Sequence, residues 1–148
     1  MKAVFLVYLF STLFMTGVIW FAQAVHYPLL GRVGKDAFVA YEKANTRRTG
    51  WVVIPVMAAE LITAFLLLWR QPEGFLPFYA WLNGGLLAGI WVSTFTLQGP
   101  YHNLLVKNFD AGVWRSLVRT NWIRTAAWTS RGILLLYALL GVGSKGAG

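Results

Sequence analysis

Two histidines are the residues of this sequence with the most distinctive chemistry. His26 follows an apolar run in the segment Ala-Val-His-Tyr-Pro, and His102 follows another in Gly-Pro-Tyr-His-Asn. Imidazole titrates near neutral pH, so either ring is a candidate general base, and the two together are candidate ligands of a metal or a haem. The sequence has no cysteine, and no third ligand stands at a standard spacing such as H-E-x-x-H, so we assign no metal ligands. The alternative is that each histidine caps a helix or meets lipid headgroups.

Polar side chains also recur on the last apolar segment at the spacing of one helical face. The stripe consists of Asn121, Arg124, Trp128 and Arg131, at intervals of three, four and three. Such intervals place side chains on one face of a helix, and polar residues of an apolar helix should face the interior of a bundle.

Three amides accompany the histidines along the chain. Gln23, Gln98 and Asn103 each stand within four residues of a histidine, and we expect them, with Trp128, to bind the substrate. The first and second halves of the chain therefore share an order: an apolar helix, a glutamine, a histidine, a long basic loop and a second helix.

Glu60 and Arg131 form the second constellation. Glu60 follows Trp51 by nine residues and Arg131 follows Trp122 by nine residues, which puts both roughly 13 Å along their helices from the same membrane face. An ionised group at that depth costs about 2.5–3.5 kcal/mol or more unless it is paired. We therefore predict a buried ion pair between them. Its role is either structural, joining two helices, or functional, as a proton relay or substrate anchor.

The elements that position these residues are four long apolar segments. The chain has 148 residues, of which 57% are hydrophobic and only 12% are charged, whereas soluble domains carry about a quarter charged residues. Segments of about 20 apolar residues span a bilayer, and within lipid they must be helical because the backbone amides find no water there. We predict a single all-α membrane domain over residues 1–148, a polytopic bundle of four transmembrane helices. Their approximate ranges are 4–25, 51–69, 78–97 and 122–142.

The connections between these segments alternate in length. The first and third are long and polar, and each contains a stretch with helical character, over 35–46 and 110–120. We expect these stretches to form short helices that lie in the membrane interface. The second connection is a short turn with two prolines.

Charge orients the predicted bundle. The net charge is +8, but the cations flank apolar spans, where they set topology and meet anionic lipid, so we exclude nucleic acid as a partner. Nine cations lie on the side of the first and third connections: Arg32, Lys35, Lys43, Arg47, Arg48, Lys107, Arg115, Arg119 and Arg124. Three lie on the other side: Lys2, Arg70 and Lys145. This imbalance favours cytoplasmic first and third connections, with both termini outside.

The third connection and last helix carry a family resemblance. The run Gly-Pro-Tyr-His-Asn-Leu-Leu is followed by Trp114 and then by Asn-Trp-Ile-Arg-Thr at 121–125. The chain resembles the anthrone-oxygenase-like family of small four-helix membrane proteins, which has many bacterial members. The residues that match the family pattern are Pro100, Asn103, Asn121 and Arg124, whereas Gly99 and His102 stand at positions where asparagines are expected. The resemblance implies a bacterial inner membrane protein and an oxygenase that acts on polyphenolic anthrones apparently without a metal.

The leading functional hypothesis is a small membrane enzyme, or a binder of a lipophilic aromatic compound, with its site at the cytoplasmic ends of the helices. If it is an oxygenase of the anthrone type, His26 or His102 removes a phenolic proton and the resulting carbanion reduces oxygen directly. In that reading we expect Arg124 and Asn121 to stabilise the developing oxyanion and Trp128 to stack on the flat substrate. One alternative is a redox protein that holds haem between the two histidines. Another is a structural or transport subunit, which with four helices would need to work as a homo-oligomer. The sequence leaves the cofactor and the substrate open.

Overall fold

Helices account for all regular secondary structure in the described part of the chain. The computed structural model describes the backbone of residues 1–144 and the side chains of residues 1–140. Lys145, counted among the cations above, lies outside the described residues. The elements in chain order are α1 (Lys2–Phe21), η1 (Ala22–His26), α2 (Tyr27–Leu30), α3 (Lys35–Trp69), α4 (Pro77–Ser93), η2 (Thr94–Gln98), α5 (Gly99–Leu105) and α6 (Ala111–Ser144), where η1 and η2 are π-helical turns.

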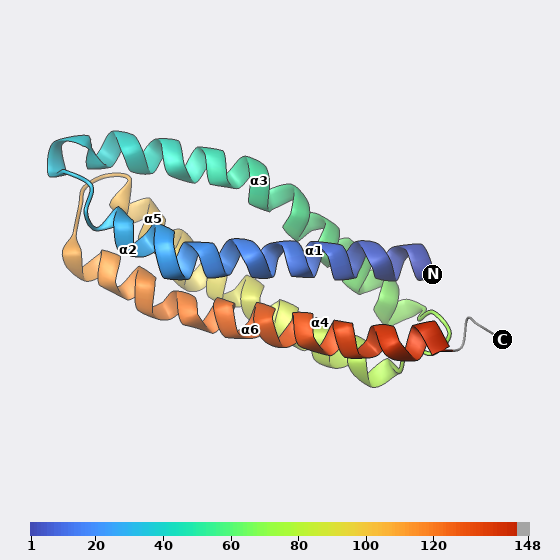
Figure 1. The fold of residues 1–148 in the computed structure, drawn as a ribbon. Coiled ribbons are helices and arrows are strands. Elements are labelled where there is room, and N and C mark those ends of the chain that lie inside the picture. Colours follow the sequence, from blue (N-terminus) through green and yellow to red (C-terminus); the bar gives the residue numbers. More distant parts are fainter. Residues whose placement is uncertain (145–148) are drawn as a thin grey trace.

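These elements form four long helices that run side by side (Figure 1). The segments α1, η1 and α2 join into one continuous helix, and α4, η2 and α5 join into another. The N-terminus, the α3–α4 turn and the end of α6 gather at one end of the bundle, and the α2–α3 and α5–α6 connections meet at the other (Figure 1). The predicted all-helical, four-helix arrangement is therefore confirmed.

Three of the four helices are long and apolar enough by themselves to cross a membrane: Lys2–Leu30, Lys35–Trp69 and Pro77–Leu105. Their outward surfaces carry large apolar side chains, including Phe10, Ile62 and Val92. The remaining helix, α6, contains Arg124 and Arg131, which lower its mean hydropathy. Both arginines are buried, however, with 8% and 0% of their surface exposed. This combination of apolar exteriors and buried charge is typical of a helical membrane protein.

The predicted interfacial helices are not separate elements, and this expectation was wrong. The stretches over 35–46 and 110–120 are helical, but they continue directly into the apolar parts of α3 and α6. Their apolar faces pack inside the bundle, where Phe38 and Leu117 contact a cluster with Tyr27, Leu30 and Leu105. Because these side chains find protein partners, the four helices extend as a bundle beyond the predicted apolar spans.

A proline follows each π-helical turn by two residues. Pro28 follows η1 and Pro100 follows η2. Proline has no backbone N–H and its ring displaces the carbonyl four residues earlier, so a π turn accommodates it without ending the helix. Gln23 lies in η1 and Gln98 in η2, and both side chains are buried.

The interior alternates between apolar and polar layers. Three apolar clusters follow the bundle axis; along α6 they include Leu135, then Trp128, then Leu117. Arg131 lies between the first two of these residues and Arg124 between the last two. We name the layer around Arg131 the central polar cluster, consisting of Thr12, Glu60, Trp128 and Arg131. We name the layer around Arg124 the His102 cluster, consisting of Gln23, Tyr27, Glu42, His102, Asn121 and Arg124.

Candidate functional site

A chain of hydrogen bonds through His102 forms the centre of the His102 cluster. The Nδ1 atom of His102 lies 2.5 Å from Oε1 of Glu42. A carboxylate only accepts hydrogen bonds, so Nδ1 carries the proton and Nε2 is the basic nitrogen. The hydroxyl of Tyr27 lies 3.3 Å from Nε2 and donates to it. The imidazole is thus oriented by a carboxylate on one side and faces a hydroxyl on the other.

The guanidinium of Arg124 completes this chain. Its Nη2 donates to the Tyr27 hydroxyl at 3.3 Å, and its Nε donates to Oδ1 of Asn121 at 3.0 Å. Nη1 reaches the hydroxyl of Thr94 at 3.3 Å. The amide of Asn121 in turn donates to Oε1 of Gln23 at 2.8 Å. These contacts hold the planar guanidinium in one orientation, with one nitrogen aimed at Tyr27.

Charge in the His102 cluster is buried and balanced. Glu42 is fully buried, and Arg124 is nearly so. Glu42 accepts a second hydrogen bond, from the side chain of Asn45 at 3.0 Å. An unpaired buried charge costs several kcal/mol, and here Tyr27 and His102 link the Glu42 carboxylate to the Arg124 guanidinium. His102 is the member with an open edge, since 20% of its side-chain surface is exposed.

The second histidine, His26, also lies against Tyr27. The ring centroids of His26 and Tyr27 are 5.8 Å apart, as are those of Tyr27 and His102. Nε2 of His26 is buried and has no hydrogen-bond partner among the described residues. The two histidines predicted to share a site therefore do so through a tyrosine ring that contacts both.

The geometry does not fit a haem or metal between the histidines. Both ring nitrogens of His102 already have partners, Glu42 and Tyr27. In the part of the chain that the structure describes, no group of three His, Cys, Asp or Glu side chains is placed to hold a metal ion. Axial ligation by His102 would require breaking its bond to Tyr27, so we derive no redox role for these residues.

The glutamines predicted to bind substrate serve mainly to link helices. Gln23 receives the Asn121 amide and donates to the carbonyl of Val118 at 3.2 Å. Gln98 receives the hydroxyl of Ser93 at 2.9 Å and donates to that of Thr120 at 3.2 Å. Two helices thus hold the same stretch of α6 from different sides, which fixes the position of Arg124.

Two further predicted site residues lie away from the His102 cluster. Trp128 was expected to stack on a substrate, but it is 1% exposed and its indole N–H donates to Glu60. It packs with Met15, Met57 and other apolar residues in the layer between the polar clusters, so the stacking role was wrong. Asn103 is exposed on α5.

The central polar cluster contains the contact expected between Glu60 and Arg131. Nη1 of Arg131 lies 2.8 Å from Oε1 of Glu60, and both side chains are fully buried. Glu60 also accepts from Thr12 at 2.9 Å and from Trp128 at 3.2 Å. The guanidinium lies 5.3 Å from the centre of the Tyr8 ring. Three donors therefore surround one carboxylate.

Two members of the His102 cluster were missed in reading the sequence. Glu42 lies in the stretch over 35–46 that was predicted only to be helical, and Tyr27 follows His26 directly; neither was predicted as a site residue. A signal for Glu42 was present, because it stands four residues after Phe38 and so shares its helical face. Phe38 and Glu42 both have 0% exposure, and a carboxylate on a buried face needs a partner.

Fold and site together describe an all-helical bundle with three helices apolar enough to cross a membrane and a buried carboxylate–histidine–tyrosine–arginine chain near one end. Comparison of the chain with models of known families, with curated proteins and with solved structures finds no match. The function must therefore be argued from the site.

Proposed function

We propose that all four long helices cross the bacterial inner membrane, with the α2–α3 and α5–α6 connections in the cytoplasm and both termini outside. The excess of cations at the end that holds the α2–α3 and α5–α6 connections supports this orientation. The central polar cluster supports a span for α6, because this helix packs against α1 and α4 and shares a buried ion pair with α3. The His102 cluster then lies toward the cytoplasmic face.

Within this arrangement, the His102 cluster is a general acid–base site for a lipophilic compound with an acidic hydroxyl. The observation that supports it is the placement of the His102 imidazole between the Glu42 carboxylate and the Tyr27 hydroxyl. A base in hydrogen-bond reach of a hydroxyl, itself oriented by a third group, is the arrangement that activates oxygen nucleophiles in many enzymes. Glu42 accepts the hydrogen bond from Nδ1 and so holds the imidazole with Nε2 toward the Tyr27 hydroxyl.

The spacing around the Tyr27 hydroxyl supports the entry of a substrate oxygen. Its separations from His102 and from Arg124 are both 3.3 Å, longer than usual for hydrogen bonds of these types. Catalytic hydrogen bonds are commonly long before substrate binds. A phenolic hydroxyl bound here gives its proton to Nε2 of His102. The phenolate oxygen then receives hydrogen bonds from Arg124 and Tyr27, two donors that a developing negative charge strengthens.

The resemblance to anthrone oxygenases suggests which reaction follows the proton transfer. In that chemistry the deprotonated substrate passes electrons to dioxygen, which is the oxidant and the second substrate. The residues of this chain would bind the phenol, remove its proton and stabilise the anion.

The test is oxygen consumption by purified protein in lipid nanodiscs with anthrone as the probe. We expect uptake by the wild type and a loss of about 10²–10⁴-fold for His102→Ala, the range typical of a removed general base. Glu42→Gln should lower the rate and shift its pH profile, because the imidazolium loses its counter-charge. Lys107→Gln is the matched control. Lys107 is exposed just after α5, the helix that carries His102, and this change should not alter the rate.

Two outcomes would contradict the proposal. The first is unchanged oxygen uptake in His102→Ala. The second is the absence of oxygen uptake with every member of a series of anthrones and simpler phenols, measured on protein whose helical content and melting temperature are intact.

A further inference from the structure

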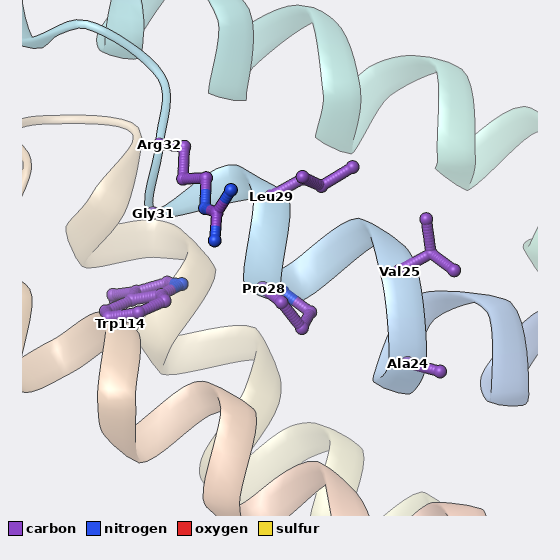
Figure 2. Close-up of a pocket in the computed structure, with 7 residues that line it drawn as sticks. All are labelled: Ala24, Val25, Pro28, Leu29, Gly31, Arg32 and Trp114. Atoms are coloured by element: carbon purple, nitrogen blue, oxygen red, sulfur yellow. The ribbon is translucent and has the colours of Figure 1, made fainter.

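A groove on the outer surface of the bundle lies close to the cytoplasmic end proposed above. Its volume is about 460 Å³, and it is formed by the end of the first long helix, the turn after α2 and one residue of α6. The lining residues are Ala24, Val25, Pro28, Leu29, Gly31, Arg32 and Trp114 (Figure 2). None of these is a hydrogen-bonding side chain of the His102 cluster, so the groove is a separate feature.

The groove changes in polarity along its length. Figure 2 shows Arg32 and Trp114 toward one end and Ala24 and Val25 toward the other, with Pro28 between them. The Ala24 end continues into the apolar surface of α1, whereas the Arg32 end lies where the helix has finished. An occupant that fits both ends carries an anionic group next to an apolar chain.

Arg32 is available to such an anion. Its side chain is exposed and belongs to neither of the ion pairs found among the described residues. Two further exposed cations are near: Lys35 is three residues after Arg32 in the sequence, and Arg115 follows Trp114 on α6. Among the described residues, no carboxylate forms an ion pair with the Arg32 guanidinium, and the nearby cations Lys35 and Arg115 favour an anionic ligand.

Trp114 forms a rigid wall at the same end. Its indole N–H donates to the carbonyl of Tyr27 at 2.8 Å. Its ring lies so close to Gly31 that a Cβ there would come within 2.4 Å of it. A tryptophan fixed at the boundary between apolar helix and polar loop is typical of the membrane interface.

We propose that this groove binds one anionic phospholipid from the adjacent leaflet. The lipid phosphate pairs with Arg32 beside the Trp114 indole, and an acyl chain follows Leu29, Val25 and Ala24 toward the bilayer interior. The direction of the polarity change carries this assignment, because it matches the headgroup-to-tail order of a lipid standing beside α1. The site is independent of catalysis at His102.

The test is native mass spectrometry of the detergent-purified protein with added phosphatidylglycerol or phosphatidylcholine. We expect the wild type to retain one phosphatidylglycerol in preference to phosphatidylcholine. Arg32→Gln should weaken phosphatidylglycerol binding about tenfold or more, the loss of one charge-assisted hydrogen bond. Arg47→Gln removes the same charge from an exposed position on α3, outside the groove, and should bind like the wild type.

A second variant separates the groove from general charge. Ala24→Phe fills the apolar end without altering charge and should also weaken binding, whereas inorganic phosphate should not displace the lipid. Equal retention of the two lipids, equal losses in Arg32→Gln and Arg47→Gln, or full binding by Ala24→Phe would each overturn the proposal. The melting temperature of each variant, measured in parallel, shows that the comparison is made on folded protein.

Discussion

Replacing Glu60 with glutamine removes the carboxylate of the central polar cluster and leaves the positive charge of Arg131 in place. Both side chains have 0% exposure, so water cannot solvate the remaining guanidinium without opening the bundle. Apart from Glu60, the Arg131 guanidinium contacts only the Tyr8 ring and the Thr12 hydroxyl among the described residues, and its Nε has no partner there; neither contact supplies a negative charge. Loss of one partner from a buried pair costs about 3–5 kcal/mol. For a chain of this size that corresponds to a fall in melting temperature of roughly 6–20 °C.

The double change Glu60→Leu with Arg131→Leu should recover much of this loss. It leaves no buried charge, and a leucine pair restores apolar contact across the interface. The Thr12 hydroxyl can turn to a backbone carbonyl of its own helix, as Thr16 does and as helical threonines commonly do. The Trp128 N–H then remains unpartnered, at a cost of about 1–3 kcal/mol. The expected order of stability is wild type, then double variant, then Glu60→Gln.

Thermal unfolding in one detergent, followed by loss of the monodisperse peak after heating, measures this order. Glu73→Gln is the matched control, because Glu73 is exposed in the α3–α4 turn and its change should leave the melting temperature unaltered. A Glu60→Gln protein as stable as the wild type would refute the reasoning, since it would mean that the pair is not ionised. A double variant less stable than Glu60→Gln would refute it in another way, because the loss would then come from packing and not from an orphaned charge.

Two further predictions test local packing and orientation. Gly31→Ala should destabilise the protein by about 1–3 kcal/mol, because the added Cβ would overlap the Trp114 ring in an already filled space. Gly17→Ala is the control in the same thermal assay, because nothing lies within 4 Å of a Cβ at that position. In intact cells, a cysteine placed at Lys43 should resist an impermeant thiol reagent and one at Glu73 should react; the reverse pattern would show that the charge imbalance does not orient this bundle.

An apolar layer separates the His102 cluster from the central polar cluster. Met15, Ile19, Met57 and Ile90 pack with Trp128 between them. Among the described residues, no side-chain hydrogen bond links the His102 cluster to the central polar cluster. The two polar clusters are therefore separate hydrogen-bonded layers.

The local pattern of the sequence was enough to predict the helices and the depth of their charged residues. A long apolar run allows only a helix in lipid, and a known rise per residue converts sequence distance into depth. For that reason the contact between Glu60 and Arg131 was predicted correctly although the two residues are far apart in the chain. The inward stripe of α6 followed from the same helical periodicity. The number of helices that cross the membrane, however, stays a prediction for α6, where buried arginines offset the apolar residues.

Tertiary structure alone decided which side chains meet. Depth along a helix does not determine rotation about its axis, and that rotation depends on packing and on the π turns before Pro28 and Pro100. Glu42 reaches His102 because the first part of α3 is continuous with the rest of that helix and packs inside the bundle. Trp128 likewise turns to Glu60 instead of a substrate, because the stripe of α6 is shared between two polar layers. The sequence supplies the residues that can pair, and helix packing determines which of them pair, because each buried charge needs a donor or acceptor within the bundle.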